Sequence, residues 1–491
     1  MKIPTKVNLD EVRIDPAWAL RVAPAIALRR LALPLCIIDD ELVTAMADTG
    51  DNQTIAAIAQ ATGKKVRPVE AEAQQLRRAL LKVYGDTRST APTGTAGRAQ
   101  TADDPVMVVD NLLRAANLRQ ASDIHIDPDR RGLKVRLRVD GILEEFIRIP
   151  TEQQAMICNR IKVMCGMDIA ERRAPQDGAF VWASSAGTEE RRQFDVRVAT
   201  LPVRFGERIT LRLLEAGRER RTLEELGMSE KHKELFERIL ERPHGLVLLT
   251  GPTGSGKSTT LYAAIRHLLR RGQMNILTVE DPVEYEIDDV AQVEIESGDK
   301  VNFSKALRSL LRHDPDVIMI GEIRDDESLD TAIKASLTGH LVLSTLHTNE
   351  AVSSVTRLID MGLAPHMIAA TLRLSAAQRL VRRLCNICRE PCEISEIEAA
   401  ATGNRNLAGQ TAYKPGGCLA CAGRGFSGRT GLFEFMIPDA EISSMIAAGA
   451  REEDIAAAMR RQGFTSLAGD AASKMLAGVT TIQEVLKTIV M

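Results

Sequence analysis

Residues 245–269 read GLVLLTGPTGSGKSTTLYAAIRHLL, and this stretch decides the fold. Its first six residues form a short, continuously apolar run, which is typical of a central parallel strand. The phosphate-binding pattern GxxxxGK[ST] follows without a mismatch, and a helical pattern follows the loop. A strand, a glycine-rich loop and a helix in this order predict an α/β sheet with a nucleotide site. The loop consists of Gly251, Pro252, Thr253, Gly254, Ser255, Gly256, Lys257, Ser258 and Thr259.

The residues of this loop have distinct expected tasks. Its glycines let backbone N–H groups close around phosphate oxygens, and the N-terminus of the following helix adds positive charge. Lys257 is expected to reach the β- and γ-phosphates, and Ser258 is expected to ligate Mg²⁺. We therefore expect ATP and Mg²⁺ as ligands; a glycine-rich turn without a ligand is the alternative.

Three further apolar strands end in polar residues. They are NILTV (275–279), DVIMI (316–320) and LVLST (341–345), and they lead into Glu280, Glu322 and His347, with His340 just ahead of the last strand. Ligands of open α/β sheets bind beyond the carboxyl ends of the strands. These side chains are therefore expected to converge on the glycine-rich loop.

Hydrolysis of ATP requires an oriented water, a metal ion and cations for the developing charge. Glu280 is the candidate to orient or deprotonate the water. Glu322 stands where an Asp is often found, so it is expected to hold Mg²⁺ through a water; its extra methylene could instead place it on the attacking water, so the two roles could be exchanged. His347 is expected to sense the γ-phosphate or a neighbouring subunit, or else to be a hydrogen-bonded loop residue.

Four arginines are candidates for charge neutralisation. In FDVRVATLPVRFGERITLRLL (194–214), Arg197 and Arg212 face away from the apolar side of their strands. Arg308 and Arg312, in SKALRSLLRHDPD (304–316), lie four residues apart on one helix face. Arginines on rigid elements can bind phosphoryl oxygens with two hydrogen bonds; solvated or salt-bridged side chains are the alternative.

Composition argues against several classes of protein. The 491 residues carry a formal net charge of −2 and only 3% aromatic side chains, which disfavours a nucleic-acid binder that uses a global basic field or base stacking. No apolar run approaches the roughly 18–20 residues that span a bilayer, and residues 1–18 lack the apolar segment of a signal peptide. We expect a cytosolic, multidomain protein.

The domain boundaries are predicted from shifts in pattern. LKVRLRV (133–139) alternates cleanly, and Asp140-Gly141 predicts a hairpin turn into 142–149. The linker sequence DTRSTAPTGTAGRAQTADD lacks large apolar residues and predicts that the first domain is mobile. The expected parts are a first domain 1–85, a flexible linker 86–104, an α+β domain 105–216, an α/β core 217–384, a cysteine-bearing module 385–430 and a helical region 431–491.

Four of the eight cysteines form two CxxC pairs, Cys385-x-x-Cys388 and Cys418-x-x-Cys421. Four thiolates at about 2.3 Å make a closed structural zinc site without the open position that catalysis needs. The sequence therefore predicts Zn²⁺ at these residues, with unpaired core cysteines as the alternative. Cys392 is a spare outside the paired pattern.

Taken together, these motifs resemble the secretion ATPase superfamily. The resemblance is carried by GPTGSGKSTTLYA, LTVEDPVEY, LRHDPDVIMIGEIRD, LTGHLVLSTLHTN, ASDIHIDP and GRTGLFEF. It implies a RecA-like P-loop core, a PAS-like second domain and a homohexameric ring. It also implies that Glu280 is the catalytic glutamate, that Arg197 and Arg212 are turned onto the nucleotide, and that Arg308 and Arg312 match an arginine pair of the catalytic domain.

Within this superfamily the chain most resembles the motors of type II secretion, with type IV pilus assembly as the nearest alternative. Retraction ATPases lack both the cysteine module and the mobile first domain. The resemblance implies that residues 1–85 bind the cytoplasmic domain of a bitopic inner-membrane protein and that the ring acts on a polytopic platform protein. The chain is then peripheral on the cytoplasmic face of the inner membrane, with indirect membrane contact and no nucleic-acid partner. A nucleic-acid motor and a scaffold that binds ATP without hydrolysis are the remaining readings.

Overall fold

The computed structural model describes residues 3–85, 104–183, 193–215, 221–272, 274–295 and 303–489. Met1–Ala216, Leu384–Glu390 and Lys414–Gly428 form one compact unit, and Gly217–Arg383, Pro391–Tyr413 and Arg429–Met491 form a second. The predicted linker 86–104 lies outside the described residues except for Asp104, whose side chain caps a helix by accepting from the N–H of Val106. The other predicted domain boundaries stay a prediction, and the segment predicted as one module, 385–430, contributes to both units.

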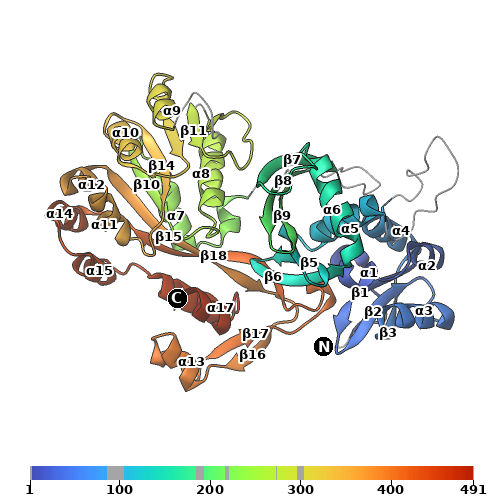
Figure 1. The fold of residues 1–491 in the computed structure, drawn as a ribbon. Coiled ribbons are helices and arrows are strands. Elements are labelled where there is room, and N and C mark those ends of the chain that lie inside the picture. Colours follow the sequence, from blue (N-terminus) through green and yellow to red (C-terminus); the bar gives the residue numbers. More distant parts are fainter. Residues whose placement is uncertain are drawn as a thin grey trace. The chain divides into compact units, whose positions relative to one another are not determined.

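The N-terminal part of the first unit is a three-stranded sheet covered by helices (Figure 1). The central strand β2 runs antiparallel to β1 and parallel to β3. Its core includes the fully buried Leu33, Leu42 and Leu76. The elements are η1 (Leu9–Glu11), α1 (Pro16–Ala19), α2 (Pro24–Arg30), β1 (Ala32–Ile38), β2 (Glu41–Met46), α3 (Asn52–Thr62), β3 (Lys65–Glu70) and α4 (Ala73–Tyr84).

The following part of the same unit is a six-stranded sheet in the order β6-β5-β4-β9-β8-β7, antiparallel throughout. The predicted hairpin is confirmed, because β5 and β6 pair and both Asp140 and Gly141 have positive φ. The alternation predicted for 133–139 is also confirmed by its burial. The elements are α5 (Pro105–Leu118), β4 (Ala121–Asp129), β5 (Gly132–Val139), β6 (Ile142–Ile149), α6 (Thr151–Met164), β7 (Gln176–Ala183), β8 (Gln193–Val203) and β9 (Gly206–Glu215).

The second unit contains a seven-stranded sheet in the order β12-β11-β13-β14-β10-β15-β18. The pairs from β12 to β15 are parallel. The elements up to the end of this parallel region are η3 (Leu223–Leu226), α7 (Glu230–Leu240), β10 (Gly245–Thr250), α8 (Lys257–Arg271), β11 (Ile276–Glu280), β12 (Ala291–Glu294), α9 (Phe303–Leu310), β13 (Val317–Ile320), α10 (Asp326–Leu337), β14 (Leu341–Leu346), α11 (Ser353–Asp360), α12 (Pro365–Thr371) and β15 (Leu372–Leu384).

The rest of the chain adds a two-stranded sheet, β16 with β17, the last strand of the large sheet and a group of short helices. The elements are β16 (Glu390–Glu393), α13 (Glu396–Ala401), η4 (Arg405–Leu407), β17 (Thr411–Lys414), η5 (Leu419–Cys421), β18 (Phe426–Met436), α14 (Ala440–Ala447), α15 (Glu452–Arg461), α16 (Leu467–Leu476) and α17 (Ile482–Ile489). Within the described residues, no helix combines the length and the apolarity needed to cross a bilayer.

Helices cover both faces of the parallel sheet, as Figure 1 shows for α8 and α10. Successive side chains of β10 enter different cores: Leu246 and Leu248 pack with α10 and α12, whereas Val247 and Leu249 pack with α7 and α8. A strand buried on both faces has no polar side to alternate with, which is why 245–250 reads as an unbroken apolar run. The predicted α/β core is confirmed, and its strand ends all meet at one edge.

Candidate functional site

The strand register brings the predicted site residues to neighbouring positions. Thr250 pairs with Leu346, so the glycine-rich loop and His347 leave adjacent strands at the same level. Val279 pairs with Ile320, which places Glu280 beside Gly321 on the next strand. In the sheet order, the ends of β11, β13, β14 and β10 therefore carry the two glutamates, the histidine and the loop side by side.

The glycine-rich loop has the shape of a cradle for an anion. Gly251 has a φ of 147°, and a Cβ there would lie 2.5 Å from the carbonyl oxygen of Gln378. The α8 helix begins at Lys257 directly after Gly256, so its unpaired N–H groups point into the loop. Ser255 Oγ is buried and has no hydrogen-bond partner among the described residues. A buried hydroxyl without a partner at a helix N-terminus fits a phosphate group.

Lys257 is buried within this cradle. Its Nζ donates to the carbonyl oxygens of Gly251, at 2.7 Å, and Pro252, at 3.3 Å. Burial, and next the charge of Arg379, lower the pKa of Lys257 to about 8. A phosphate would favour the ammonium form again, because an anion nearby stabilises the charged lysine. Ser258 follows at the surface, where its hydroxyl is accessible to Mg²⁺.

The pKa of Lys257 predicts an alkaline limit for ATP capture. Because the lysine loses its proton as the pH rises through about 8, kcat/KM should fall above that pH. kcat should not show this limb, since bound phosphate keeps the lysine charged. Arg379→Gln should move the limb to higher pH, because the arginine lowers the lysine pKa. Steady-state rates from pH 6 to 10 measure both; a flat kcat/KM through this range would contradict the assignment.

Glu280 ends β11 and is 4% exposed. Its carboxylate accepts hydrogen bonds from Thr278 Oγ1 at 2.7 Å, from Gln292 Nε2 at 3.1 Å and from the hydroxyl of Tyr262. Burial raises the pKa of Glu280 above its ordinary value, although the three hydrogen bonds oppose the rise. A fixed carboxylate with a raised pKa suits a general base, which works best near the ambient pH.

Glu322 has a different environment. It forms an ion pair with Arg324, which also binds Asp281 at 2.8 Å, and its Oε2 accepts from His347 Nε2 at 3.2 Å. Burial, and next the charges of Lys257 and Arg324, lower the pKa of His347 below its ordinary value. The structure therefore brings Glu322 and His347 together, and Lys257 lies close enough to act on the histidine.

The four candidate arginines have the following neighbours. Arg308 forms an ion pair with Glu327 at 2.8 Å, and Arg312 donates to the carbonyl of Arg308 and to Ser309 Oγ. In the first unit, Arg212 is paired with Arg197 in the strand register and contacts Asp123 at 3.2 Å. The side chain of Arg212 remains 61% exposed, so the ion pair leaves it accessible.

The four predicted cysteine ligands form one buried cluster, and their sulfur atoms all lie within 4.8 Å of one another. The Sγ–Sγ distances are 3.8 Å for Cys385–Cys418, 3.7 Å for Cys388–Cys421 and 3.8 Å for Cys418–Cys421. A tetrahedron with Zn–S bonds of about 2.3 Å has edges of about 3.8 Å. These distances exceed a disulfide bond. The donor set and its spacing therefore fit a structural zinc ion.

Comparison with known proteins identifies the family. The model of the type II/IV secretion system proteins matches residues 99–487, and the model of the MshEN domain matches residues 1–90. The chain is a type II/IV secretion system protein. The predicted resemblance is thereby confirmed for most of the sequence.

Individual members of this family cover most of the chain. It is 45% identical over 386 residues to type II secretion system protein E of Dickeya dadantii, which spans 78% of this chain and 76% of the relative. It is 40% identical to the type II secretion system protein HxcR of Pseudomonas aeruginosa, over 96% and 92%. It is 37% identical to the type IV pilus assembly ATPase PilB of Myxococcus xanthus, over 98% and 88%.

The ATPase DotB of Legionella pneumophila is similar in structure, with a TM-score of 0.57 and 23% identity, over 80% of this chain and 96% of that one. This similarity shows the RecA-like fold that was predicted.

Sequence reasoning missed a part of this secretion-family site that β15 supplies. Arg379 donates to the carbonyl and the side chain of Asn349, at 2.9 and 3.1 Å, and its charge acts on Lys257. Gln378 Oε1 accepts from Thr260 at 2.9 Å. β15 is parallel to β10, so these residues lie beside the loop. A strand-end pattern could not have found them, because Gln378 and Arg379 lie inside β15 and not at its end.

Metal removal tests the cysteine cluster of this secretion-family protein. The purified chain should contain about one zinc ion per molecule, because the four thiolates make a closed site. Cys385→Ser should lose most of this zinc, since one of the four ligands is gone. Cys392→Ser is the matched control, because Cys392 lies outside the cluster and should keep full zinc content. Zinc-free wild type, or equal losses in both variants, would exclude the site; elemental analysis of the folded proteins gives the result.

Proposed function

We propose that the chain is the ATPase motor of a type II secretion system and that it works as a homohexamer. It hydrolyses ATP, and the ring uses this energy to assemble the pseudopilus that drives protein export. The observation that carries the proposal is the set of residues at one sheet edge: a buried P-loop lysine, two glutamates and a histidine on adjacent strands. The family membership of residues 99–487 supports it.

The residues divide the chemistry among them. Lys257 and the N–H groups of the loop would bind the β- and γ-phosphates, and Ser258 would ligate Mg²⁺, which would supply charge neutralisation at the phosphates. Glu280 takes a proton from the attacking water, because it is fixed by three hydrogen bonds and its pKa is raised. Glu322 pairs with Arg324 and His347 and would help to hold the bound Mg²⁺, and His347 links Glu322 to the loop that follows β14.

Arginines complete the charge balance. Arg197 and Arg212 are adjacent on a rigid antiparallel pair, so both guanidinium groups can be presented together when their domain turns onto a nucleotide. Arg308 and Arg312 lie on and directly after α9, four residues apart, and serve the phosphates of the same or a neighbouring subunit. Both side chains of the Arg308–Glu327 ion pair are exposed, so the pair is weak and Arg308 can leave Glu327 to bind a phosphate.

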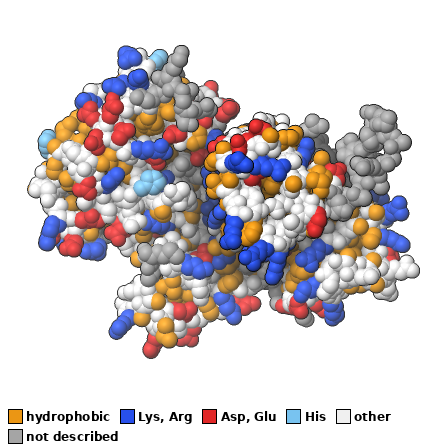
Figure 2. Space-filling model, viewed as in Figure 1, with side chains coloured by type: hydrophobic (Ala, Val, Ile, Leu, Met, Phe, Trp, Pro, Cys, Tyr) orange, Lys and Arg blue, Asp and Glu red, His pale blue; other side chains and the backbone are white. Residues whose placement is uncertain are grey.

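The remaining parts hold the motor in place. Residues 1–85 bind the cytoplasmic domain of a bitopic inner-membrane protein, and the ring acts on a polytopic platform protein. The chain is thus cytoplasmic and peripheral on the inner membrane. On the face shown in Figure 2, basic and acidic side chains are interspersed over the ATPase unit, and the formal net charge is −2. This pattern does not favour a motor that grips nucleic acid.

Type IV pilus assembly is the alternative within the same family. The relative PilB covers 98% of this chain at 37% identity, against 40% identity over 96% for HxcR, so the difference is small. A deletion strain separates the two. Complementation with the wild-type chain should restore export of secreted enzymes into the medium and leave surface pili unchanged; restored pili without restored export would support the pilus motor.

A further inference from the structure

The two cysteine pairs form a knuckle, residues 385–388 and 418–421, that packs against residues 3–85 within the first unit. Leu419 stands between Cys418 and Cys421, in the single turn of η5. It is 8% exposed and belongs to the same hydrophobic core as Leu33 and Leu42 of the N-terminal sheet. A residue between two metal ligands thus fills part of the N-terminal domain's core.

Backbone contacts reinforce this docking. The N–H of Arg13 donates to the carbonyl of Leu419 at 3.0 Å. Gly423 faces the carbonyl oxygen of Ile37 so closely that a Cβ would lie 2.5 Å from that atom. Both contacts join the knuckle to backbone rather than to flexible side chains. The contact with the N-terminal domain therefore depends on the backbone conformation of the 418–423 turn.

An ion-pair network surrounds the same contact. Arg119 binds Asp15 at 2.5 Å and Glu144 at 3.5 Å, and Arg424 lies 4.0 Å from Glu144. Asp15 belongs to the N-terminal domain and Arg424 follows the knuckle. The Arg119–Asp15 pair is largely buried, with side-chain exposures of 8% and 14%, whereas Glu144 is 36% exposed, so its pairs with Arg119 and Arg424 contribute less.

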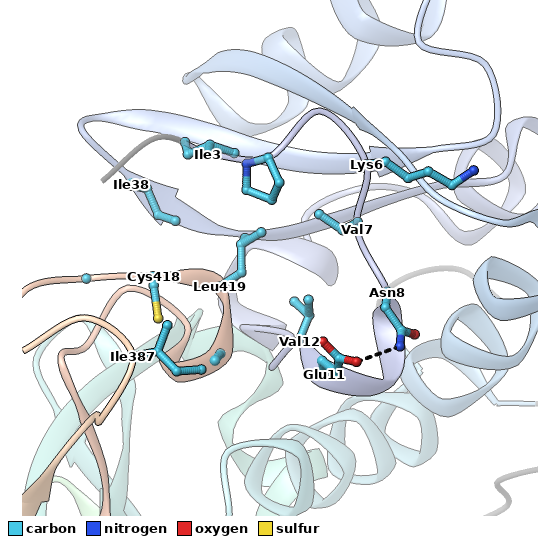
Figure 3. Close-up of a pocket in the computed structure, with 13 residues that line it drawn as sticks. Ile3, Lys6, Val7, Asn8, Glu11, Val12, Ile38, Ile387, Cys418 and Leu419 are labelled. Atoms are coloured by element: carbon cyan, nitrogen blue, oxygen red, sulfur yellow. Dashed lines mark hydrogen bonds between the residues drawn. The ribbon is translucent and has the colours of Figure 1, made fainter.

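The contact is incompletely packed. A cavity of about 280 Å³ lies between the N-terminal segment and the knuckle (Figure 3). Its walls are mostly apolar and include Ile3, Val7, Val12, Ile38, Ile387 and Leu419. Ile387, between the other two cysteines, is 57% exposed. This pocket is partly open to solvent and is not an enclosed void, so solvent reaches the edge of the contact between the knuckle and residues 3–85.

The turn that carries Leu419 depends on its sulfur ligands. Cys421 Sγ accepts from the N–H groups of Cys418, at 3.4 Å, and Gly425, at 3.2 Å. These two hydrogen bonds tie the sulfur to the backbone of the turn, so a metal ion bound by the four cysteines would also fix the path of the turn. Without a metal ion, no bond holds the four sulfur atoms about 3.8 Å apart. The backbone of the 418–423 turn is then less constrained.

We propose that the cysteine knuckle is a metal-dependent clasp for the N-terminal domain. With the metal bound, the 418–423 turn is fixed and residues 3–85 dock on Leu419 and Gly423. Without the metal, the turn loosens and the N-terminal domain is released from the knuckle, while the ATPase unit remains folded. The cluster then sets the position of the proposed membrane-partner domain in addition to stabilising its own loop.

Hydrogen exchange of the full chain tests the clasp, with zinc content measured on the same samples. The segments to follow are 9–20, which contains the Arg13 amide, and 32–38, which contains Ile37. A zinc chelator should speed exchange at these segments by a factor of about 5 to 30, which corresponds to a loss of about one to two kcal/mol of local stability. Exchange in β10 should not change. Unchanged exchange at 9–20 after zinc loss, or an equal rise in β10, would overturn the proposal.

A matched pair of glycine variants separates docking from metal binding. Gly423 and Gly428 have nearly the same positive φ, 76° and 77°, but a Cβ at Gly428 meets no atom within 4 Å. Gly423→Ala should therefore speed exchange at 9–20 with normal zinc content, whereas Gly428→Ala should behave as wild type. If the two variants have the same effect, backbone strain explains it and the clasp is excluded.

Discussion

Replacing Lys257 with alanine is expected to lower kcat/KM for ATP by about 10²- to 10³-fold, the usual effect of removing one preorganised donor from the charge that develops in a transition state. The lysine is buried in the loop, 2.7 Å from the carbonyl of Gly251, and no other lysine lies in the loop. ATP affinity should fall as well, because the same ammonium binds the ground-state phosphates. Steady-state phosphate release and fluorescent-nucleotide titration measure the two effects.

Lys334→Ala is the matched control for this substitution. Lys334 is 66% exposed on α10 and pairs with Asp330 four residues earlier, so its loss should cost only about 0.3–0.5 kcal/mol of stability and leave turnover unchanged. Equal turnover of Lys257→Ala and Lys334→Ala would show that the glycine-rich loop is not the hydrolytic site.

Glu280→Gln is expected to bind ATP with near-normal affinity but to slow turnover by about 10²- to 10⁴-fold, the range for loss of a general base. The raised pKa of Glu280 gives a further signature. A base must be deprotonated, so wild-type kcat should fall as the pH drops through this raised pKa. The variant should lose that acid limb. Single-turnover hydrolysis across pH 4.5–8 measures it.

Glu322→Gln is the comparison that assigns the base. The Glu322 carboxylate pairs with Arg324 and His347 and should help to hold Mg²⁺. The turnover of the variant should therefore depend more strongly on Mg²⁺ concentration, while its kcat should still fall at acid pH. Normal turnover of Glu280→Gln together with a stalled Glu322→Gln would transfer the role of base to Glu322.

Much of the core could be predicted from the sequence, because each of these strands of the parallel sheet appears as its own short apolar run. The apolar runs at 245–250, 275–279, 316–320 and 341–345 correspond to β10, β11, β13 and β14 within one residue at each end. Their carboxyl ends must meet in a parallel sheet, so Glu280, Glu322 and His347 could be placed near the loop without coordinates. The cysteine cluster was likewise predicted from spacing alone, and the distances fit zinc.

Long-range contacts could not be predicted in the same way. The neighbour of the glycine-rich loop, Arg379, comes from a strand more than 100 positions later, and its parallel pairing with β10 has no local signature. From the sequence, Tyr262 would be taken for an ordinary aromatic residue of the core. In the structure its hydroxyl donates a hydrogen bond to the Glu280 carboxylate. The packing of Leu419 into the core of residues 3–85 also joins two segments that are far apart in the sequence, and local patterns carry no signal for such a contact.

The most direct test of the motor is Mg²⁺-dependent ATP turnover of the wild-type chain, measured on a sample whose oligomeric state is determined by light scattering. The account predicts that the hexamer releases phosphate and that Lys257→Ala, assembled to the same size, does not. If the wild-type hexamer binds ATP but never releases phosphate, even with the cytoplasmic domain of the proposed membrane partner added, the chain is a nucleotide-binding scaffold and the account is contradicted.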